Sequence, residues 1–224
     1  MKKELWLIWK EPTSRKRHVV GTLIKHNTNY TFKYNLNEVE EAKKNGFDYF
    51  PGFNDVKKIY QGEKLFTNII ARLPNVNRED YVAILESYNL TKENDAIEIL
   101  EKTKGRLLTD TFEFVPVFNE TNIEFEIAAT RYSQDIKKCI NLLKVGDNVI
   151  LELEKNNQYD KNAVIIFIDK NNNKHKLGYV PNYYAEYIAT ALKKEKHEYT
   201  AKIINLKENS LINDEQITVK LDFV

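Results

Sequence analysis

The sequence predicts an α+β protein built from two small domains, and three observations support this. Short runs rich in β-branched and aromatic residues alternate with polar turns in both halves of the chain, which is typical of antiparallel strands. Several other segments space their apolar residues at i, i+3 and i+4, as amphipathic helices do. A short polar stretch over residues 116–122 separates the two groups of elements. We therefore expect one domain over residues 1–118 and a second over residues 123–224.

In the first domain the strands are expected to form an antiparallel meander, because short turns connect three of them directly. The predicted strands cover residues 4–9, 18–24, 30–34 and 106–115. The predicted helices cover residues 38–44, 81–88 and 95–104. The first helix carries acids early and lysines late, in agreement with the helix dipole, and Gly46 and Gly105 end two of the helices.

In the second domain strands again dominate. The predicted strands cover residues 123–130, 147–154, 164–168, 176–180, 199–205 and 216–223. The predicted helices cover residues 136–144 and 181–194, and a loop is expected at 208–214. Asp135 is expected to cap the first helix, and Pro181 suits the start of the second because its missing N–H is not needed there.

Composition limits the classes of protein that the chain can represent. Hydrophobic residues make up 42% and charged residues 30%, which is ordinary for a folded soluble protein. The single cysteine excludes an intramolecular disulfide and a cysteine zinc cluster, and the four histidines form no i, i+4 pair, so we expect no metal or other cofactor. No apolar run approaches 18 residues and the first residues are charged too early for a signal peptide, so we expect a cytoplasmic protein without membrane contact.

The charge balance restricts how nucleic acid can be bound. The formal net charge is +1 and both halves are nearly neutral, so any contact with phosphates is expected to be short and local. Arg15, Lys16 and Arg17 form a basic turn that can contact phosphate, although a solvated hairpin tip is the commoner outcome for such a cluster.

The loop between the predicted strands 147–154 and 164–168 carries Tyr159, Asp160 and Asn162. A flat ring that stacks on a base beside an acceptor that holds a hydroxyl suggests a pocket for the end of a nucleotide chain. A polar loop whose tyrosine caps a small barrel explains the same residues equally well.

Three motifs follow one another in the second domain: Arg131-Tyr132, residues 157–163 (Asn-Gln-Tyr-Asp-Lys-Asn-Ala), and residues 177–181 (Leu-Gly-Tyr-Val-Pro). Together they resemble the HIRAN domain, from about residue 123 to the C-terminus. In that family the module is a small β-barrel with helices that binds the free 3′-hydroxyl end of single-stranded DNA. The resemblance therefore implies a C-terminal barrel with two helices and a single-stranded DNA partner.

The resemblance also implies a set of DNA-binding residues: Arg131, Tyr132, Tyr159, Asp160, Tyr179 and Asn182. Arg131 would offer a planar fork to a phosphate, or alternatively pair with Glu126 or Asp160. Tyr132 and Tyr159 would stack on the terminal base, or alternatively fill the barrel core. Asp160 would accept a hydrogen bond from the 3′-hydroxyl, or alternatively form a turn before Lys161.

Two positions depart from the family pattern. Tyr179 stands where the eukaryotic relative has a histidine, and Asn182 stands where it has a lysine. Tyr179 can still stack or donate a hydrogen bond, whereas Asn182 removes a positive contact and suits a helix start equally well. The ligand or its affinity is therefore expected to differ.

The first domain resembles the N-terminal subdomain of HipA-type kinases over residues 4–117. The motifs are Gly21-Thr-Leu and residues 30–34, 66–74 and 112–114. The chain has no glycine-rich phosphate loop and no catalytic loop, so this resemblance implies an interaction or scaffold role.

No acid–base pair and no nucleophile with an evident base is recognisable, so we expect a protein without catalytic activity. The sequence favours recognition of the 3′-hydroxyl end of single-stranded DNA, with a protein partner bound through the N-terminal domain, and DNA repair is one setting for it. The alternative is an adaptor of a toxin–antitoxin or defence system whose barrel binds no DNA. A nuclease or kinase-like enzyme is a third interpretation.

Overall fold

The computed structural model describes residues 2–119, 121–194, 198–207 and 216–223, and the chain divides into two compact units, Met1–Val117 and Phe118–Val224. We refer to them as the N-terminal unit and the C-terminal unit. The loop predicted at residues 208–214 lies outside the described residues. In the described part of the chain, no helix has both the length and the apolar character needed to cross a membrane.

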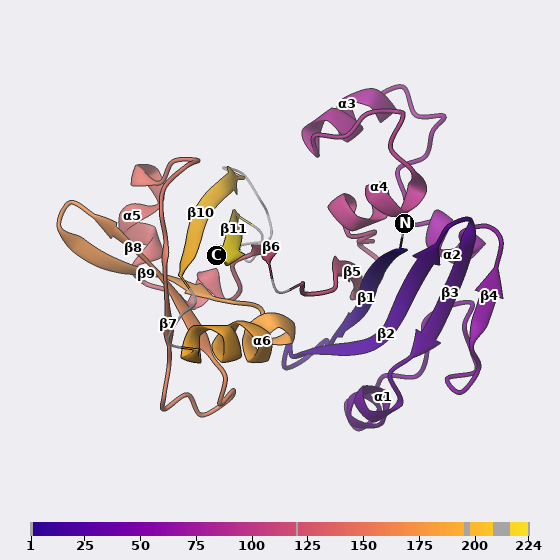
Figure 1. Ribbon diagram of the computed structural model, residues 1–224, viewed down its shortest axis with the longest axis horizontal. Coiled ribbons are helices and arrows are strands. Elements are labelled where there is room, and N and C mark those ends of the chain that lie inside the picture. The colour runs from indigo at the N-terminus through magenta and orange to yellow at the C-terminus, as the bar shows by residue number, and fades with distance from the viewer. Residues whose placement is uncertain (1, 120, 195–197, 208–215, 224) are drawn as a thin grey trace. The chain divides into compact units, whose positions relative to one another are not determined.

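The N-terminal unit is built on a five-stranded antiparallel sheet (Figure 1). Its strands are β1 (Lys2–Lys10), β2 (Arg17–His26), β3 (Asn29–Tyr34), β4 (Tyr60–Gly62) and β5 (Phe112–Pro116). Their order in the sheet is β4-β3-β2-β1-β5, which confirms the meander and shows that β5 returns to pair with β1. The helices are α1 (Leu36–Lys43), α2 (Thr67–Ile70), α3 (Tyr81–Ser87) and α4 (Ala96–Thr103).

Helix α4 is fixed at its start by a capping box. The side chain of Asp95 accepts hydrogen bonds from the backbone N–H groups of Ile97 and Glu98, and the Glu98 carboxylate accepts one from the Asp95 N–H. These bonds satisfy donors that the first turn of a helix leaves without partners. The cap therefore sets the helix so that Ile97 and Leu100 enter the core.

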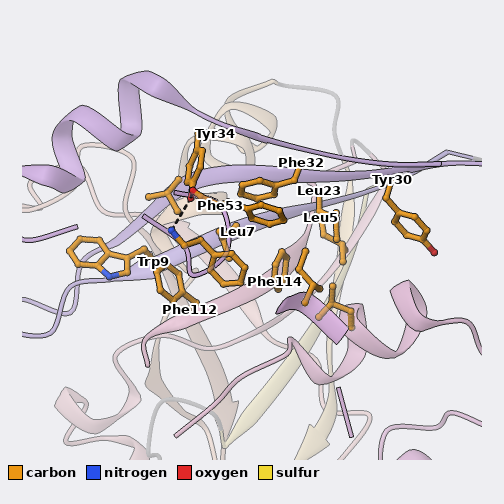
Figure 2. Close-up of a cluster of buried hydrophobic side chains, with 14 of the residues drawn as sticks. Leu5, Leu7, Trp9, Leu23, Tyr30, Phe32, Tyr34, Phe53, Phe112 and Phe114 are labelled. Atoms are coloured by element: carbon orange, nitrogen blue, oxygen red, sulfur yellow. Dashed lines mark hydrogen bonds between the residues drawn. The ribbon is translucent and has the colours of Figure 1, made fainter. Parts of the chain in front are cut away.

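Aromatic side chains form the centre of this core (Figure 2). Phe32 of β3 stacks on Phe53 with ring centroids 4.3 Å apart. The buried hydroxyl of Tyr34 donates to the Phe53 carbonyl at 2.7 Å and accepts from the Phe50 N–H at 2.8 Å. Because this hydroxyl bonds main-chain groups on both sides of the turn at residues 50–53, it holds the turn against the sheet.

The C-terminal unit contains two three-stranded antiparallel sheets. They have the strand orders β10-β11-β6 and β7-β8-β9. Their strands are β6 (Asn122–Glu126), β7 (Ile150–Leu153), β8 (Val164–Lys170), β9 (Asn173–Tyr179), β10 (Tyr199–Leu206) and β11 (Ile217–Phe223). The helices are η1 (Thr130–Tyr132), α5 (Ile136–Cys139), η2 (Ile140–Leu142) and α6 (Asn182–Lys193).

Two short seams join these sheets into one small barrel. At the first seam, Ala128 and Tyr179 exchange both backbone hydrogen bonds, at 2.8 and 2.9 Å. At the second, the residues before β7 pair with β10, with Asn148 opposite Lys202. Six strands thus close on themselves, which confirms the predicted α+β class and the small C-terminal barrel and leaves few sheet edges unpaired.

Gly178 permits the close approach at the first seam. A Cβ atom on this residue would lie 2.4 Å from the Ala128 carbonyl oxygen and 2.7 Å from Cγ2 of Ile127. No side chain fits at these distances without moving the backbone of the seam. The glycine of the third motif is therefore required by the closure of the barrel.

The helix predicted over residues 136–144 is shorter than expected. The α-helical part α5 ends at Cys139 and a single 3-10 turn follows, because Leu143 turns extended so that the chain can pair with β10 from Gly146 onward. Asp135 occupies the N-cap position, as predicted, but its side chain makes no capping hydrogen bond. Its carboxylate instead bonds Lys138 Nζ at 2.9 Å and faces the Lys176 N–H at 3.5 Å, which places α5 beside β9.

Candidate nucleic-acid interface

Arg131 and Tyr132 lie together on η1, immediately after the first seam. Ala129, with a left-handed φ of 60°, turns the chain out of the strand, and buried Thr130 anchors the turn. The Arg131 guanidinium lies 4.7 Å from the centroid of the Tyr132 ring, a cation–π distance. Tyr132 is 72% exposed, so it does not belong to the barrel core.

Asn157 organises the loop between β7 and β8. Its Oδ1 accepts the backbone N–H groups of Tyr159 and Asp160 at 2.8 and 2.9 Å, and its Nδ2 donates to Glu154 at 2.5 Å. Side-chain bonds of this kind define a turn without regular structure. They hold Tyr159 on the outside of the barrel, where its side chain is 96% exposed.

Asp160 has a structural role in the same loop. Its Oδ1 accepts the Asn162 N–H at 2.8 Å, and its backbone carbonyl accepts the Ala163 N–H at 3.0 Å. Asp160 therefore forms the turn that was the alternative to a ligand-binding role. The second carboxylate oxygen, Oδ2, accepts no hydrogen bond from the described residues, so this half-buried group keeps acceptor capacity for a ligand.

Tyr179 is tied to this loop through Glu154. Its hydroxyl donates to Glu154 Oε2 at 3.0 Å, the same oxygen that accepts from Asn157. Lys176 donates to the Tyr179 hydroxyl at 2.6 Å, and its ammonium lies 4.1 Å from the ring centroid. One network thus connects β9 with the loop that carries Tyr159 and Asp160.

A β-bulge explains why Lys176 lies beside Tyr179. Residues three apart in a regular strand point to opposite faces of the sheet. Here Ile166 pairs with Gly178 and Phe167 pairs with Lys176, so Leu177 is an extra residue in β9. The extra residue brings Lys176 and Tyr179 to the same face. Sequence reasoning missed Lys176 and Glu154 for this reason, since the bulge leaves no signal in the alternation pattern.

Asn182 occupies a different place from the other predicted residues. It is the first residue of α6, after Pro181, and it is exposed. The described hydrogen bonds link η1 to β9, through Ser133 and the Lys176 carbonyl, and link β9 to the β7–β8 loop. The structure therefore brings five of the six predicted residues to connected segments around β9 and places Asn182 at a helix start.

The interface carries mixed charge. Lys176 contributes a cation next to Tyr179, and Arg131 contributes a second on η1. Within the described ranges, no group of three or more histidine, cysteine, aspartate or glutamate side chains is arranged to hold a metal ion. The arrangement thus offers exposed rings, two cations and a carboxylate, which are the groups that contact a base, a phosphate and a hydroxyl.

Comparison with known proteins identifies one family in the C-terminal unit. The HIRAN domain family matches residues 121–222. Among solved structures, the HIRAN domain of human HLTF is 17% identical, over 46% of this chain and 74% of that one, with a TM-score of 0.36. A protein from Lactobacillus plantarum is 24% identical, over 46% of this chain and 92% of that one, with a TM-score of 0.34. No curated protein matches the chain.

These comparisons give no support to the resemblance between the first domain and HipA-type kinases, which stays a prediction. The family match begins only three residues after the start of the C-terminal unit and extends almost to its end. Residues 121–222 of this chain are therefore a HIRAN domain.

Proposed function

We propose that the HIRAN domain of this chain binds the 3′-hydroxyl end of single-stranded DNA and that the protein acts by binding, without catalysis. The observation that carries the proposal is the Tyr159–Asp160 pair. A ring that is 96% exposed is held on a hydrogen-bonded loop, next to a carboxylate oxygen that accepts nothing from the described residues. A base that stacks on such a ring gains ~1–3 kcal/mol.

Asp160 gives the proposal its specificity. A carboxylate repels a phosphate and accepts a hydrogen bond from a hydroxyl, so it favours a strand that ends in a free hydroxyl over one that ends in a phosphate. Arg131 would contact the phosphate that precedes the terminal sugar, and Tyr132 would support the base. Lys176 would supply the positive contact that Asn182 removes, because it stands beside Tyr179.

The test is a binding titration of the full chain with two single strands that differ only at the 3′ end, one with a hydroxyl and one with a phosphate. We expect the hydroxyl strand to bind more tightly. Asp160→Asn should abolish this preference and leave the melting temperature unchanged, since the amide oxygen can still accept the Asn162 N–H. Asp169→Asn, at an exposed aspartate of β8, is the matched control and should preserve the preference.

The adaptor function is the second candidate, because the N-terminal unit exposes several apolar side chains. Leu108 is fully exposed, and Val76, Ile70 and Leu107 are also exposed, as protein-binding surfaces commonly are. We propose that a protein partner binds the N-terminal unit whether or not the HIRAN domain binds DNA. Equal binding of the two DNA strands, or no binding of either, would favour an adaptor whose barrel has lost its DNA ligand.

A further inference from the structure

The turn end of the β1–β2 hairpin in the N-terminal unit concentrates positive charge. Lys10 at the end of β1 lies directly opposite Arg17 at the start of β2. Like charges at opposite positions of an antiparallel pair destabilise the sheet. Arg15 lies in the connecting turn, and Arg106 approaches from the segment before β5. We call Lys10, Arg15, Arg17 and Arg106 the hairpin cluster.

Two buried carboxylates lie at this hairpin: Glu11 bonds His18, and Glu113 faces the cations of the cluster. Glu113 is 4% exposed and accepts from Arg17 Nε at 3.2 Å and from Arg106 Nε at 2.8 Å. Burial alone would raise the pKa of Glu113, but the charges of Arg106 and Arg17 hold it well below its usual value. Glu113 therefore carries one negative charge that two guanidinium groups already share.

Lys10 is left in an unfavourable environment. It has no ion-pair partner among the described residues, and partial burial together with the charges of Arg17 and Arg15 lowers the pKa of its ammonium group. At Lys10 the repulsion by Arg17 and by Arg15 each outweighs the attraction by Glu113, so the hairpin cluster keeps a positive potential there although the chain as a whole is almost neutral.

Arg15 is the least satisfied member of the cluster. Its φ of 65° lies in the left-handed region, where glycine and asparagine are the ordinary residues. Its Nε is buried and has no hydrogen-bond partner among the residues that the structure describes. A buried N–H of a charged group without a partner is costly, and an anion from outside the chain would remove that cost.

We propose that the hairpin cluster binds phosphate groups of a nucleic-acid strand, with Arg15 and Lys10 as the principal contacts. Guanidinium groups match the oxygens of a phosphate in a bidentate geometry, and lysine adds a point charge. The cluster extends over two strands and a turn and continues to exposed Lys16, which suits a backbone with repeated phosphates better than a single ion. The basic turn is thus assigned to ligand binding, against the solvated hairpin tip that the sequence favours.

The test uses the full chain and a single strand whose 3′ end is blocked by a phosphate, so that the HIRAN domain contributes little specific binding. We expect Arg15→Asn to weaken binding about tenfold at low salt, the loss of one charge-assisted contact. The slope of log K against log salt should fall by ~0.7, the share of one phosphate contact on a single strand. Inorganic phosphate should compete with the strand on the parent chain and less so on the variant.

Stability and a matched control separate binding from damage to the fold. Asparagine tolerates the left-handed conformation, so the melting temperature of Arg15→Asn should equal or exceed that of the parent. Lys33→Gln removes one exposed charge from β3 of the same unit and should leave the affinity unchanged. Asp160→Asn should change only the preference for a 3′-hydroxyl. The two variants therefore distinguish a failure of the hairpin-cluster proposal from a failure of the proposed HIRAN function.

Unchanged affinity and salt slope in Arg15→Asn, or an equal loss in Lys33→Gln, would overturn the proposal. Competition by inorganic phosphate without any effect of Arg15→Asn on the strand would overturn the assignment to nucleic acid.

Discussion

The two units of this chain bury their apolar residues in different ways. The N-terminal unit covers an open sheet with a cluster of aromatic side chains, so its integrity depends on how those rings pack. The C-terminal unit closes two sheets into a barrel through backbone hydrogen bonds at two seams. Because the main chain makes the closure, the side chains of Lys176 and Tyr179 next to the first seam are available to form the interface.

The units also differ in their buried charge. Among the described residues, the buried acidic and basic side chains Glu11, His18, Arg72 and Glu113 all belong to the N-terminal unit. In the C-terminal unit the buried polar side chains Thr130 and Ser133 do not titrate, and burial raises the pKa of the Cys139 thiol further above neutral pH. We therefore expect the pH dependence of stability to arise mainly in the N-terminal unit.

The largest expected effect is on the aromatic core. Phe32→Ala removes a fully buried ring that stacks on Phe53, and should lower the free energy of unfolding by about 4 kcal/mol. Both tryptophans, Trp6 and Trp9, lie in β1, so tryptophan fluorescence during urea unfolding reports on this unit. Phe167→Ala, at a half-buried ring of β8, should leave the fluorescence midpoint in place.

The second-largest effect is expected at the first seam, where Ala128 pairs with Tyr179. Gly178→Ala places a Cβ against the Ala128 carbonyl and should destabilise the C-terminal unit by about 3 kcal/mol, measured by far-UV circular dichroism. Gly146→Ala is the control, because it has a φ of 96° but open space around it, and should cost only about 1 kcal/mol. Equal losses in the two variants would show that backbone conformation, and not the close approach, matters at the seam.

A smaller effect is expected in the network beside the seam. Tyr179→Phe removes the hydroxyl that bridges Lys176 and Glu154, and should cost about 1 kcal/mol of stability. It should also weaken binding of the 3′-hydroxyl strand, since the loop with Tyr159 loses its link to β9. Tyr132→Phe, at a largely exposed ring, should leave thermal stability unchanged; a similar loss there would argue against the network.

The smallest expected effect is the pH dependence of His18. Its Nε2 lies 2.8 Å from Glu11 and its Nδ1 lies 3.4 Å from Glu38. The hydrogen bond with Glu38 raises the pKa of His18, burial opposes it, and the bond with Glu11 adds to the rise. The folded state thus binds the proton more tightly than the unfolded state does.

The stabilisation by His18 is therefore complete below its unfolded pKa of about 6.5 and is lost as the pH rises through the higher folded value. The fluorescence midpoint of urea unfolding should fall over this range. His18→Gln should flatten the profile, whereas His26→Gln, at an exposed residue, should not. A midpoint that rises with pH would contradict the assignment.

Local sequence patterns predicted most elements correctly and failed where distant contacts decide the outcome. Alternation placed β1 to β3, and helical spacing with the closing Gly105 placed α4. The helix predicted to 144 stops early because the following residues pair with β10, some sixty positions later in the chain. No local pattern contains that partner.

The same limit applies to the interface. Motifs predicted Tyr159, Asp160 and Tyr179 as candidates, because their residue types suit contact with a base and a hydroxyl. Lys176 could not be identified, since only the extra residue Leu177 brings it beside Tyr179. The overall charge was likewise a poor guide to the hairpin cluster, because an average over 224 residues conceals a local excess.

The two backbone hydrogen bonds between Ala128 and Tyr179 have a consequence for how this domain can evolve. They involve no side-chain atom, so residues 176 and 179 can be exchanged without reopening the barrel, whereas Gly178 between them cannot. A library that varies only those two positions would sample new preferences for strand ends on an unaltered scaffold.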